Sequence, residues 1–93
     1  MTERVVIVGA ADECHLRVRS PLVSAKHCSI TEVMGTDGPL YYVEDLGSTN
    51  GTYLVREDSH GINWDVRTVG PSRVRIRPGY QIRVARTTLP WKG

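Results

Sequence analysis

Two short polar stretches carry the side chains of this sequence that could bind a ligand or take part in a reaction. They are Ser24–His27 and Gly47–Thr52. Ser24 and His27 have the residue types of a nucleophile and its base. A hydrolase of that kind also needs an oriented base, an oxyanion hole and usually a Gly-x-Ser-x-Gly turn, and this chain has no such turn. The sequence therefore does not favour an enzyme.

Cys14 with His15, and His27 with Cys28, are residue types that bind metals. Adjacent residues of a strand point to opposite faces, so each pair supplies at most one ligand to a common site. Two ligands do not make a structural zinc site. We therefore expect no metal and no cofactor, and we expect the two cysteines to be buried free thiols.

The second polar stretch has the composition of an exposed turn. Asn50 and Gly51 tolerate a positive φ, which lets the chain reverse tightly before a strand that begins at Thr52. Ser48, Thr49 and Asn50 then stand at a loop tip. Short polar groups in such a place can hydrogen-bond a phosphate oxygen or the backbone of an extended peptide.

Short apolar runs between turn residues must position these loops. The segments expected to form strands are 5–8, 14–19, 28–34, 40–46, 52–55, 62–69, 73–77 and 81–85. No window of 11 residues or more shows helical periodicity, so no helix longer than about two turns is expected. Many short strands separated by frequent turns predict an all-β fold, an antiparallel β-sandwich of two twisted sheets. With 93 residues, the chain is expected to form a single domain over 1–93.

The composition is that of a globular protein, with 40% hydrophobic and 24% charged residues. The longest apolar run, Val5–Ala11, is too short to span a membrane. Residues 1–4 are too few for a signal peptide, so a cytoplasmic location is expected.

Basic residues are concentrated near the C-terminus, although the net charge is only +2. Arg73, Arg75, Arg77 and Arg83 alternate with other residues on either side of a Pro-Gly turn. This pattern predicts a hairpin with the four arginines along one sheet face. The face is either a solvated surface or a site for an anionic partner. Without interleaved aromatic residues or a reading helix, nucleic acid is not favoured as that partner.

Three segments taken together resemble the forkhead-associated (FHA) domain, a β-sandwich that binds phosphothreonine peptides through its loops. They are Ser24-Ala-Lys-His27, Val43-Glu-Asp-Leu-Gly-Ser-Thr-Asn-Gly-Thr52, and 74–84 with its Pro-Gly break. The resemblance covers essentially the whole chain. It implies a non-catalytic interaction module whose partner is a phosphothreonine-containing protein or peptide. It also implies that the loops holding Ser24 and Ser48–Asn50 meet at one end of the fold, with His27 bracing them.

The chain departs from the family pattern where the phosphate binds. The pattern begins Gly-Arg, and alignment without gaps backward from His27 places Gly9 on the glycine and Ala10 on the phosphate-pairing arginine. Ala25 stands where a second arginine is frequent. A charge-assisted hydrogen bond contributes about 1.5–3 kcal/mol. Its loss predicts phosphate binding weaker by roughly 10- to 150-fold.

Further departures lie in the second half of the chain. The stretch 56–71 is longer than the usual connection, and its Trp64 is expected either to pack an added arm or to anchor an interface. Tyr80 stands where Gly-Asp is usual, and Ala85 stands where a glycine is usual.

The resulting prediction is a phosphothreonine-recognition module weakened at Ala10. Residues expected to contact the peptide are Ser24, Lys26, Ser48, Thr49, Asn50 and Arg19, and those expected to be structural are Gly9, His27, Gly51 and Thr52. Arg17 and Arg19 share a face of the expected strand, so either could turn toward a phosphate. Two alternatives stay open: an interaction domain independent of phosphate, and binding of an anionic partner through the arginine face.

Overall fold

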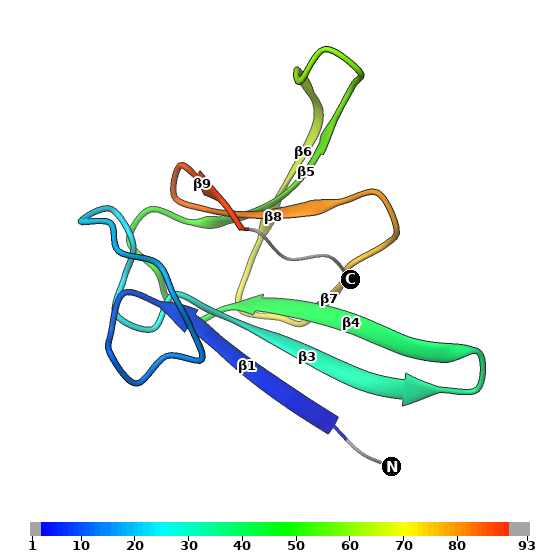
Figure 1. Ribbon diagram of the computed structural model, residues 1–93, viewed down its shortest axis with the longest axis horizontal. Coiled ribbons are helices and arrows are strands. Elements are labelled where there is room, and N and C mark those ends of the chain that lie inside the picture. Colours follow the sequence, from blue (N-terminus) through cyan, green and yellow to red (C-terminus); the bar gives the residue numbers. More distant parts are fainter. Residues whose placement is uncertain (1–2, 90–93) are drawn as a thin grey trace.

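The chain forms two β-sheets packed as a sandwich (Figure 1). The structure, a computed structural model, describes residues 3–89, apart from the side chains of Asn63 and Trp64. Within that range every regular element is a strand, and no helix could cross a membrane. All strand pairs are antiparallel except the one between the first two strands. The expected antiparallel β-sandwich is therefore confirmed.

The larger sheet has five strands in the order β2-β1-β3-β4-β7. They are β1 (Glu3–Gly9), β2 (Leu16–Arg17), β3 (Cys28–Gly35), β4 (Gly38–Asp45) and β7 (Val74–Arg75). The strand expected over 14–19 is reduced to two residues. Its first part turns instead, because the Cys14 N–H donates to the Ala11 carbonyl and the Cys14 thiol to the Ala25 carbonyl.

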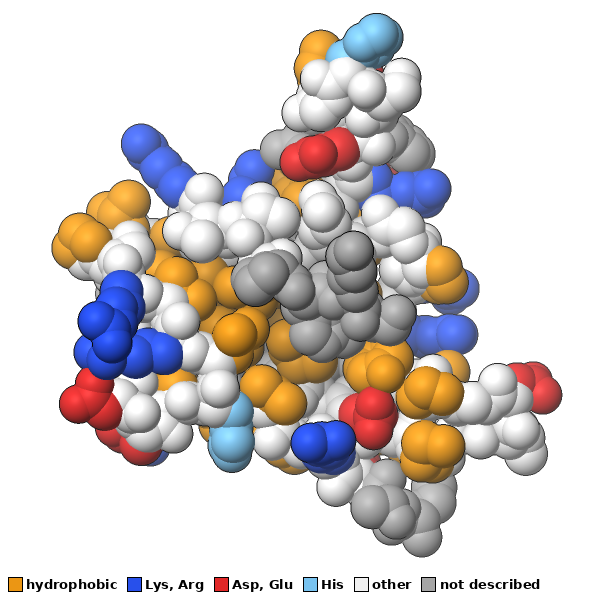
Figure 2. Space-filling model, in the orientation of Figure 1, with side chains coloured by type: hydrophobic (Ala, Val, Ile, Leu, Met, Phe, Trp, Pro, Cys, Tyr) orange, Lys and Arg blue, Asp and Glu red, His pale blue; other side chains and the backbone are white. Residues whose placement is uncertain are grey.

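The smaller sheet has four strands in the order β6-β5-β8-β9. They are β5 (Thr52–Glu57), β6 (Asn63–Val69), β8 (Gln81–Val84) and β9 (Thr87–Thr88). We call the β5–β6 hairpin the arm. Its far part projects beyond the sandwich (Figure 1). Figure 2 shows this far part standing clear of the main body. It accounts for the unusually long stretch 56–71, while the role expected of the Trp64 side chain lies outside the described residues.

The predicted hairpin of arginine-bearing strands is wrong. β7 pairs with β4 in the larger sheet, whereas β8 pairs with β5 in the smaller sheet. The chain crosses between the sheets near Pro78, so Arg75 and Arg83 belong to different sheets. A Pro-Gly turn is compatible with a hairpin or with a crossover, and the local pattern does not distinguish them. The four arginines therefore do not line one face.

The core fills the space between the sheets. Six aliphatic side chains, at most 2% exposed, form its centre: Val8, Ile30 and Val43 from the larger sheet, and Leu54, Ile82 and Val84 from the smaller. Burying each such side chain contributes about 1.5–3 kcal/mol. The core thereby fixes the strand ends from which the polar loops emerge.

Candidate phosphopeptide site

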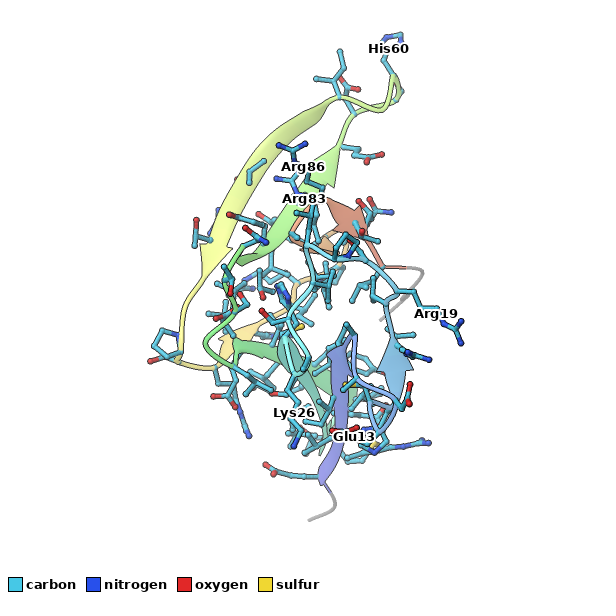
Figure 3. All side chains as sticks on the ribbon, turned by 90° about the vertical axis from the view of Figure 1, so that its left-hand side faces the viewer. Glu13, Arg19, Lys26, His60, Arg83 and Arg86 are labelled. Atoms are coloured by element: carbon cyan, nitrogen blue, oxygen red, sulfur yellow. The ribbon has the colours of Figure 1, made fainter. Side chains whose placement is uncertain are left out.

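The two polar loops meet at one end of the sandwich. The backbone N–H of Thr49 donates to Ser24 Oγ over 3.1 Å, and the side-chain amide of Asn50 donates to the Leu22 carbonyl over 2.8 Å. We call the loops 10–26 and 46–51, with the turn at 85–86, the loop end. Figure 3 views the molecule from this end. Because direct hydrogen bonds join the loops, one small ligand can contact both.

His27 joins the two loops from beneath. Its side chain is fully buried, and its Nδ1 accepts a hydrogen bond from the Ser24 backbone N–H over 3.1 Å. Its Nε2 lies 2.7 Å from the Gly51 carbonyl oxygen. Since Nδ1 accepts, Nε2 carries the ring proton and donates to that carbonyl. One imidazole thus fixes the positions of both loops.

Asp45 organises the second loop and was missed by the sequence analysis. Its carboxylate accepts the backbone N–H groups of Gly47 and Ser48 over 3.0 and 2.9 Å, and the hydroxyls of Ser48 and Thr52 over 2.5 and 2.6 Å. Partial burial on its own would raise the pKa of Asp45. The hydrogen bonds from Ser48, Thr52 and Gly47 outweigh burial and hold the pKa below its ordinary value. An aspartate two residues before a glycine is a known turn former, and that signal could have identified it.

Ser48 and Thr52 use their hydroxyl protons inside the protein. The Ser48 hydroxyl donates to Asp45 and accepts the Gly51 backbone N–H over 3.1 Å. Thr52, which is fully buried, donates to the same carboxylate. The Ser48 side chain therefore shapes the loop in this structure, and its proton does not face outward.

Three polar groups at the loop end keep hydrogen-bonding capacity. Ser24 Oγ accepts from Thr49, but the Ser24 hydroxyl proton has no acceptor within residues 3–89. The same holds for the exposed Thr49 hydroxyl. Asn50 donates through its amide nitrogen, while its Oδ1 has no donor in the described part of the chain. A ligand therefore meets two hydroxyl donors and one amide acceptor.

Two glycines allow the backbones at this end to approach closely. A Cβ on Gly9 would lie 2.1 Å from the Ala25 carbonyl oxygen, so no other residue fits without movement of the backbone. Gly51 has φ 87° and a Cβ there would lie 2.6 Å from the Tyr53 hydroxyl oxygen. Both positions require glycine for steric reasons.

No arginine extends from position 10, where the family pattern has one. Ala10 is half-buried against the core. Arg17 lies beside it: its Nε donates to the Ala10 carbonyl over 3.0 Å, and its guanidinium pairs with Asp12 at 2.8 Å. The face that Arg17 was expected to share with Arg19 is not a strand face, because β2 ends at Arg17. The Arg17 guanidinium, which contacts Ala10, is thus already bonded to groups of the protein itself.

Other cations surround the loop end. Arg19, Lys26, Arg83 and Arg86 lie on this side of the molecule, with Glu13 as the labelled acidic side chain (Figure 3). Arg19 and Lys26 are exposed and form no ion pair with the residues described. Positive charge at this end attracts anionic ligands over several ångströms.

A pocket of about 620 Å³ adjoins Asn50. It is lined by Leu22, Asn50, Tyr53, Arg83, Ala85 and Arg86. The Arg83 guanidinium lies 5.2 Å from the centre of the Tyr53 ring. The Arg83 Nε is buried and has no hydrogen-bond partner among the described residues.

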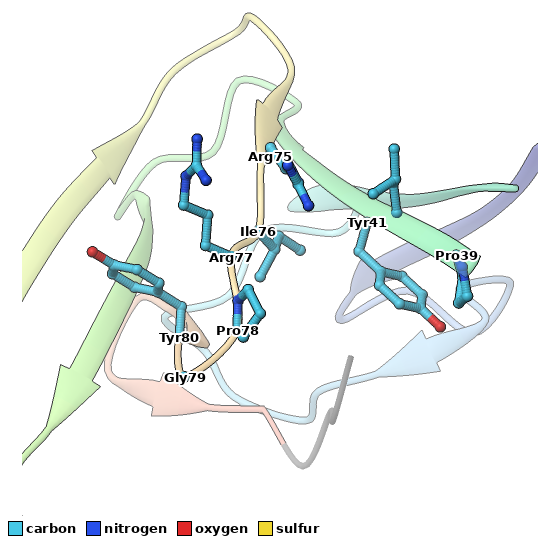
Figure 4. A pocket seen from close by; sticks show the side chains of 9 residues that line it. Pro39, Tyr41, Arg75, Ile76, Arg77, Pro78, Gly79 and Tyr80 are labelled. Carbon is cyan, nitrogen blue, oxygen red and sulfur yellow. The ribbon is translucent and has the colours of Figure 1, made fainter. Parts of the chain in front are cut away.

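A second hollow, of about 350 Å³, lies at the crossover from β7 to β8 (Figure 4). Pro39, Tyr41, Arg77 and Tyr80 are among its lining residues. It contains none of the side chains expected to bind phosphate.

The two cysteines are buried free thiols, as expected. Burial raises the pKa of Cys28 to about 12, which keeps it a neutral thiol. Across residues 3–89, no group of three His, Cys, Asp or Glu side chains could hold a metal ion.

Comparison with known proteins gives consistent matches. A model of the FHA domain family matches residues 6–85. The chain is 34% identical over 89 residues to the FHA domain-containing protein FhaB of Mycobacterium tuberculosis, and 43% identical over 84 residues to FhaB of Mycolicibacterium smegmatis. These matches cover 96% and 90% of this chain but 48% and 44% of the relatives. The chain thus spans about half the length of the curated relatives it matches.

Solved structures show the same fold. The MEK1 FHA domain, crystallised in complex with a phosphothreonine peptide of HOP1, matches with a TM-score of 0.65 and 30% identity, over 91% of this chain and 74% of that one. The FhaA FHA domain, crystallised with the intracellular domain of another protein, matches with a TM-score of 0.61 and 20% identity, over 95% and 79% of the two chains. At 20% identity, the second match shows the fold alone.

Proposed function

The chain belongs to the FHA domain family, and from this premise we propose that its loop end binds phosphothreonine-containing peptides without catalysing a reaction on them. The observation that carries the proposal is the direct hydrogen bond between Ser24 and Thr49, which places two free hydroxyl donors at one point on the surface. A protein of 30% identity, the MEK1 FHA domain, has been crystallised with a phosphothreonine peptide, which supports this class of ligand.

In this proposal, Ser24 and Thr49 donate their hydroxyl protons to phosphate oxygens. Hydrogen bonds to a charged acceptor are shorter and about twice as strong as neutral ones. Asn50 accepts a backbone N–H of the peptide through its free Oδ1, which fixes the direction of the peptide across the loop. His27, Asp45 and Ser48 act as positioning residues, because their polar atoms bond within the protein.

The pocket beside Asn50 accommodates a peptide side chain next to the phosphothreonine. Its two cations, Arg83 and Arg86, favour an acidic or hydrogen-bond-accepting residue there.

The absence of an arginine at position 10 makes phosphate affinity lower than in a member that has one. Arg17 does not substitute for it, since its guanidinium is held by the Ala10 carbonyl and by Asp12. Arg19 and Lys26 contribute long-range attraction instead. That contribution is screened by salt, and the affinity should therefore fall as ionic strength rises.

Titration of a degenerate phosphothreonine peptide library against its unphosphorylated twin tests the proposal. We expect preferential binding of the phosphorylated library, weakened at least fivefold by Ser24→Ala because one phosphate contact is lost. Thr36→Ala removes a hydroxyl from the exposed β3–β4 turn and serves as the matched control with unchanged affinity. Equal binding of the two libraries would contradict the proposal.

Ala10→Arg tests the role given to position 10. If the pocket is otherwise intact, the variant gains roughly tenfold or more in phosphopeptide affinity. Ser24→Ala in the same background should remove most of that gain, because both groups contact one phosphate.

The second candidate function is a phosphate-independent interaction domain, and the missing arginine favours it. It predicts no gain from Ala10→Arg and equal binding of the two libraries. Binding of an anionic partner through an arginine face has lost its structural basis, because the arginines are divided between the sheets.

A further inference from the structure

The outer edge of the smaller sheet is unpaired. β6 is the terminal strand of that sheet, and within residues 3–89 no strand lies on its far side. In Figure 3 it forms the outermost ribbon of the arm. Its pairing with β5 is in regular register from Asp65 to Val69, and the irregularity lies toward the tip of the arm. A strand edge is a template for a further strand unless Pro, a bulge or charged side chains block it. Residues 65–69 have no Pro, Lys or bulge, and their two charged side chains, Asp65 and Arg67, are of opposite sign.

The residues of this edge present different chemistry on the two sides of the sheet. Asp65 and Arg67 lie on the side that buries Val69, as shown by the pairing of Arg67 with the core residue Leu54. Val66 lies on the opposite side and is 48% exposed. The edge therefore has an exposed aliphatic residue flanked symmetrically by one acidic and one basic residue.

We propose that β6 pairs with β6 of a second copy of this chain, antiparallel and centred on Val66. That pairing joins the two four-stranded sheets into one continuous sheet. Asp65 of each copy stands opposite Arg67 of the partner subunit on one side, and the two Val66 side chains meet on the other. Opposite charges and paired aliphatic residues at directly facing positions both stabilise antiparallel strands.

The charge pattern also selects this register. A pairing centred on Arg67 places two arginines opposite each other, and one centred on Asp65 opposes two aspartates. Like charges directly opposite are destabilising. Asp65 is held in place, since it accepts the Tyr80 hydroxyl over 2.6 Å and lies 3.6 Å from Arg67 of its own chain. The self-complementary sequence Asp65-Val66-Arg67 thus favours a second copy over an unrelated peptide.

The dimer should be weak. Two paired edge strands bury less than the roughly 1,200 Å² of a stable standard interface. We expect a dissociation constant on the order of 100 µM at low salt, increasing with ionic strength because exposed ion pairs are screened. No predicted phosphate-contacting residue lies in β6, so this inference and the peptide-binding proposal can fail separately.

Sedimentation equilibrium from about 10 µM to 1 mM tests the proposal, with the upper value set about tenfold above the expected dissociation constant. Wild type should shift from monomer to dimer across the series. Arg67→Asp and Asp65→Arg should each weaken self-association at least tenfold, because each makes the edge repel its own copy. An equimolar mixture of the two variants should dimerise again, since the acidic edge of one then faces the basic edge of the other.

Arg77→Asp is the matched control. It makes the same change of charge at an exposed residue outside β6 and should leave the dimer unchanged. Recovery in the mixture also shows that both variants are folded. A wild type that stays monomeric to 1 mM, an Arg67→Asp variant that dimerises like wild type, or a mixture that stays monomeric would each overturn the proposal.

Discussion

The loop end and the arm are both rich in polar residues, yet they are built in different ways. At the loop end, side chains connect segments that are distant in sequence: His27 reaches Gly51, 24 residues away, and Thr49 reaches Ser24, 25 residues away. The arm is held mainly by its own strand ladder, by short-range hydrogen bonds to the Asp58 carboxylate in its turn, and by the hydrogen bond from Tyr80 to Asp65.

This difference has a consequence for binding. A site whose polar groups are already fixed loses little conformational entropy when a ligand arrives, so each contact contributes more to affinity. The loop end meets that condition. The arm instead presents backbone groups along an open edge, which suits lateral pairing with another strand.

The largest contrast is expected between two of the histidines, one at the loop end and one in the arm. His27→Ala should lower the free energy of unfolding by about 3–5 kcal/mol, because it opens a cavity, leaves the Ser24 N–H without a partner and removes one of the two hydrogen bonds to the Gly51 carbonyl. His60→Ala, at the exposed tip of the arm, should change it by less than about 0.5 kcal/mol. Urea denaturation of both variants measures the difference. Equal losses would show that the arm contributes as much to stability as the loop end.

The next contrast compares two turn-forming aspartates. Asp45 accepts four hydrogen bonds at the loop end, whereas exposed Asp58 accepts the backbone N–H groups of His60 and Ile62 in the arm. Asp45→Ala should cost about 2–3 kcal/mol of folding free energy and Asp58→Ala about 0.5 kcal/mol. Phosphopeptide affinity should fall only in the Asp45 variant, as isothermal titration would show.

The pH dependence of stability should follow from the same carboxylate. The pKa of Asp45 is lower in the folded protein than in the unfolded chain, so the unfolded chain binds its proton first as the pH falls. The stability contributed by Asp45 is therefore complete above about pH 4 and decreases below it. Asp45→Asn should reduce the loss of stability at acidic pH, as measured by unfolding curves at several pH values. An unchanged loss of stability would assign it to other carboxylates.

The smallest expected effect concerns backbone strain at the loop end. Ala85 has φ 54°, a left-handed conformation that disfavours residues with a Cβ, and its N–H donates to the Gly51 carbonyl over 2.9 Å. Ala85→Gly should relieve this strain and, after loss of one buried methyl group, stabilise the fold by about 0.5 kcal/mol. Ala25→Gly, where φ is not positive, should destabilise it by a similar amount. Thermal unfolding of the two variants gives the sign of each change in stability. A loss of stability in both variants would show that Ala85 is unstrained.

The sequence alone was sufficient for the features that depend on local pattern. Period-two alternation predicted strands over 28–34 and 62–69, and the structure has Cys28–Gly35 and Asn63–Val69. Turn residues marked the polar loop at 47–51, and the resemblance to the FHA domain placed it at the same end as the loop holding Ser24. These predictions succeed because side-chain alternation and turn preferences are properties of neighbouring residues.

The tertiary structure decided which segments meet. It assigned β7 and β8 to different sheets, directed the Ser48 proton to Asp45, and held Arg17 against the Ala10 carbonyl. An alternating strand specifies which of its faces is apolar but not which strand it pairs with. A hydroxyl or guanidinium likewise bonds whichever acceptor the fold brings near, and that choice is set by contacts between residues far apart in the chain.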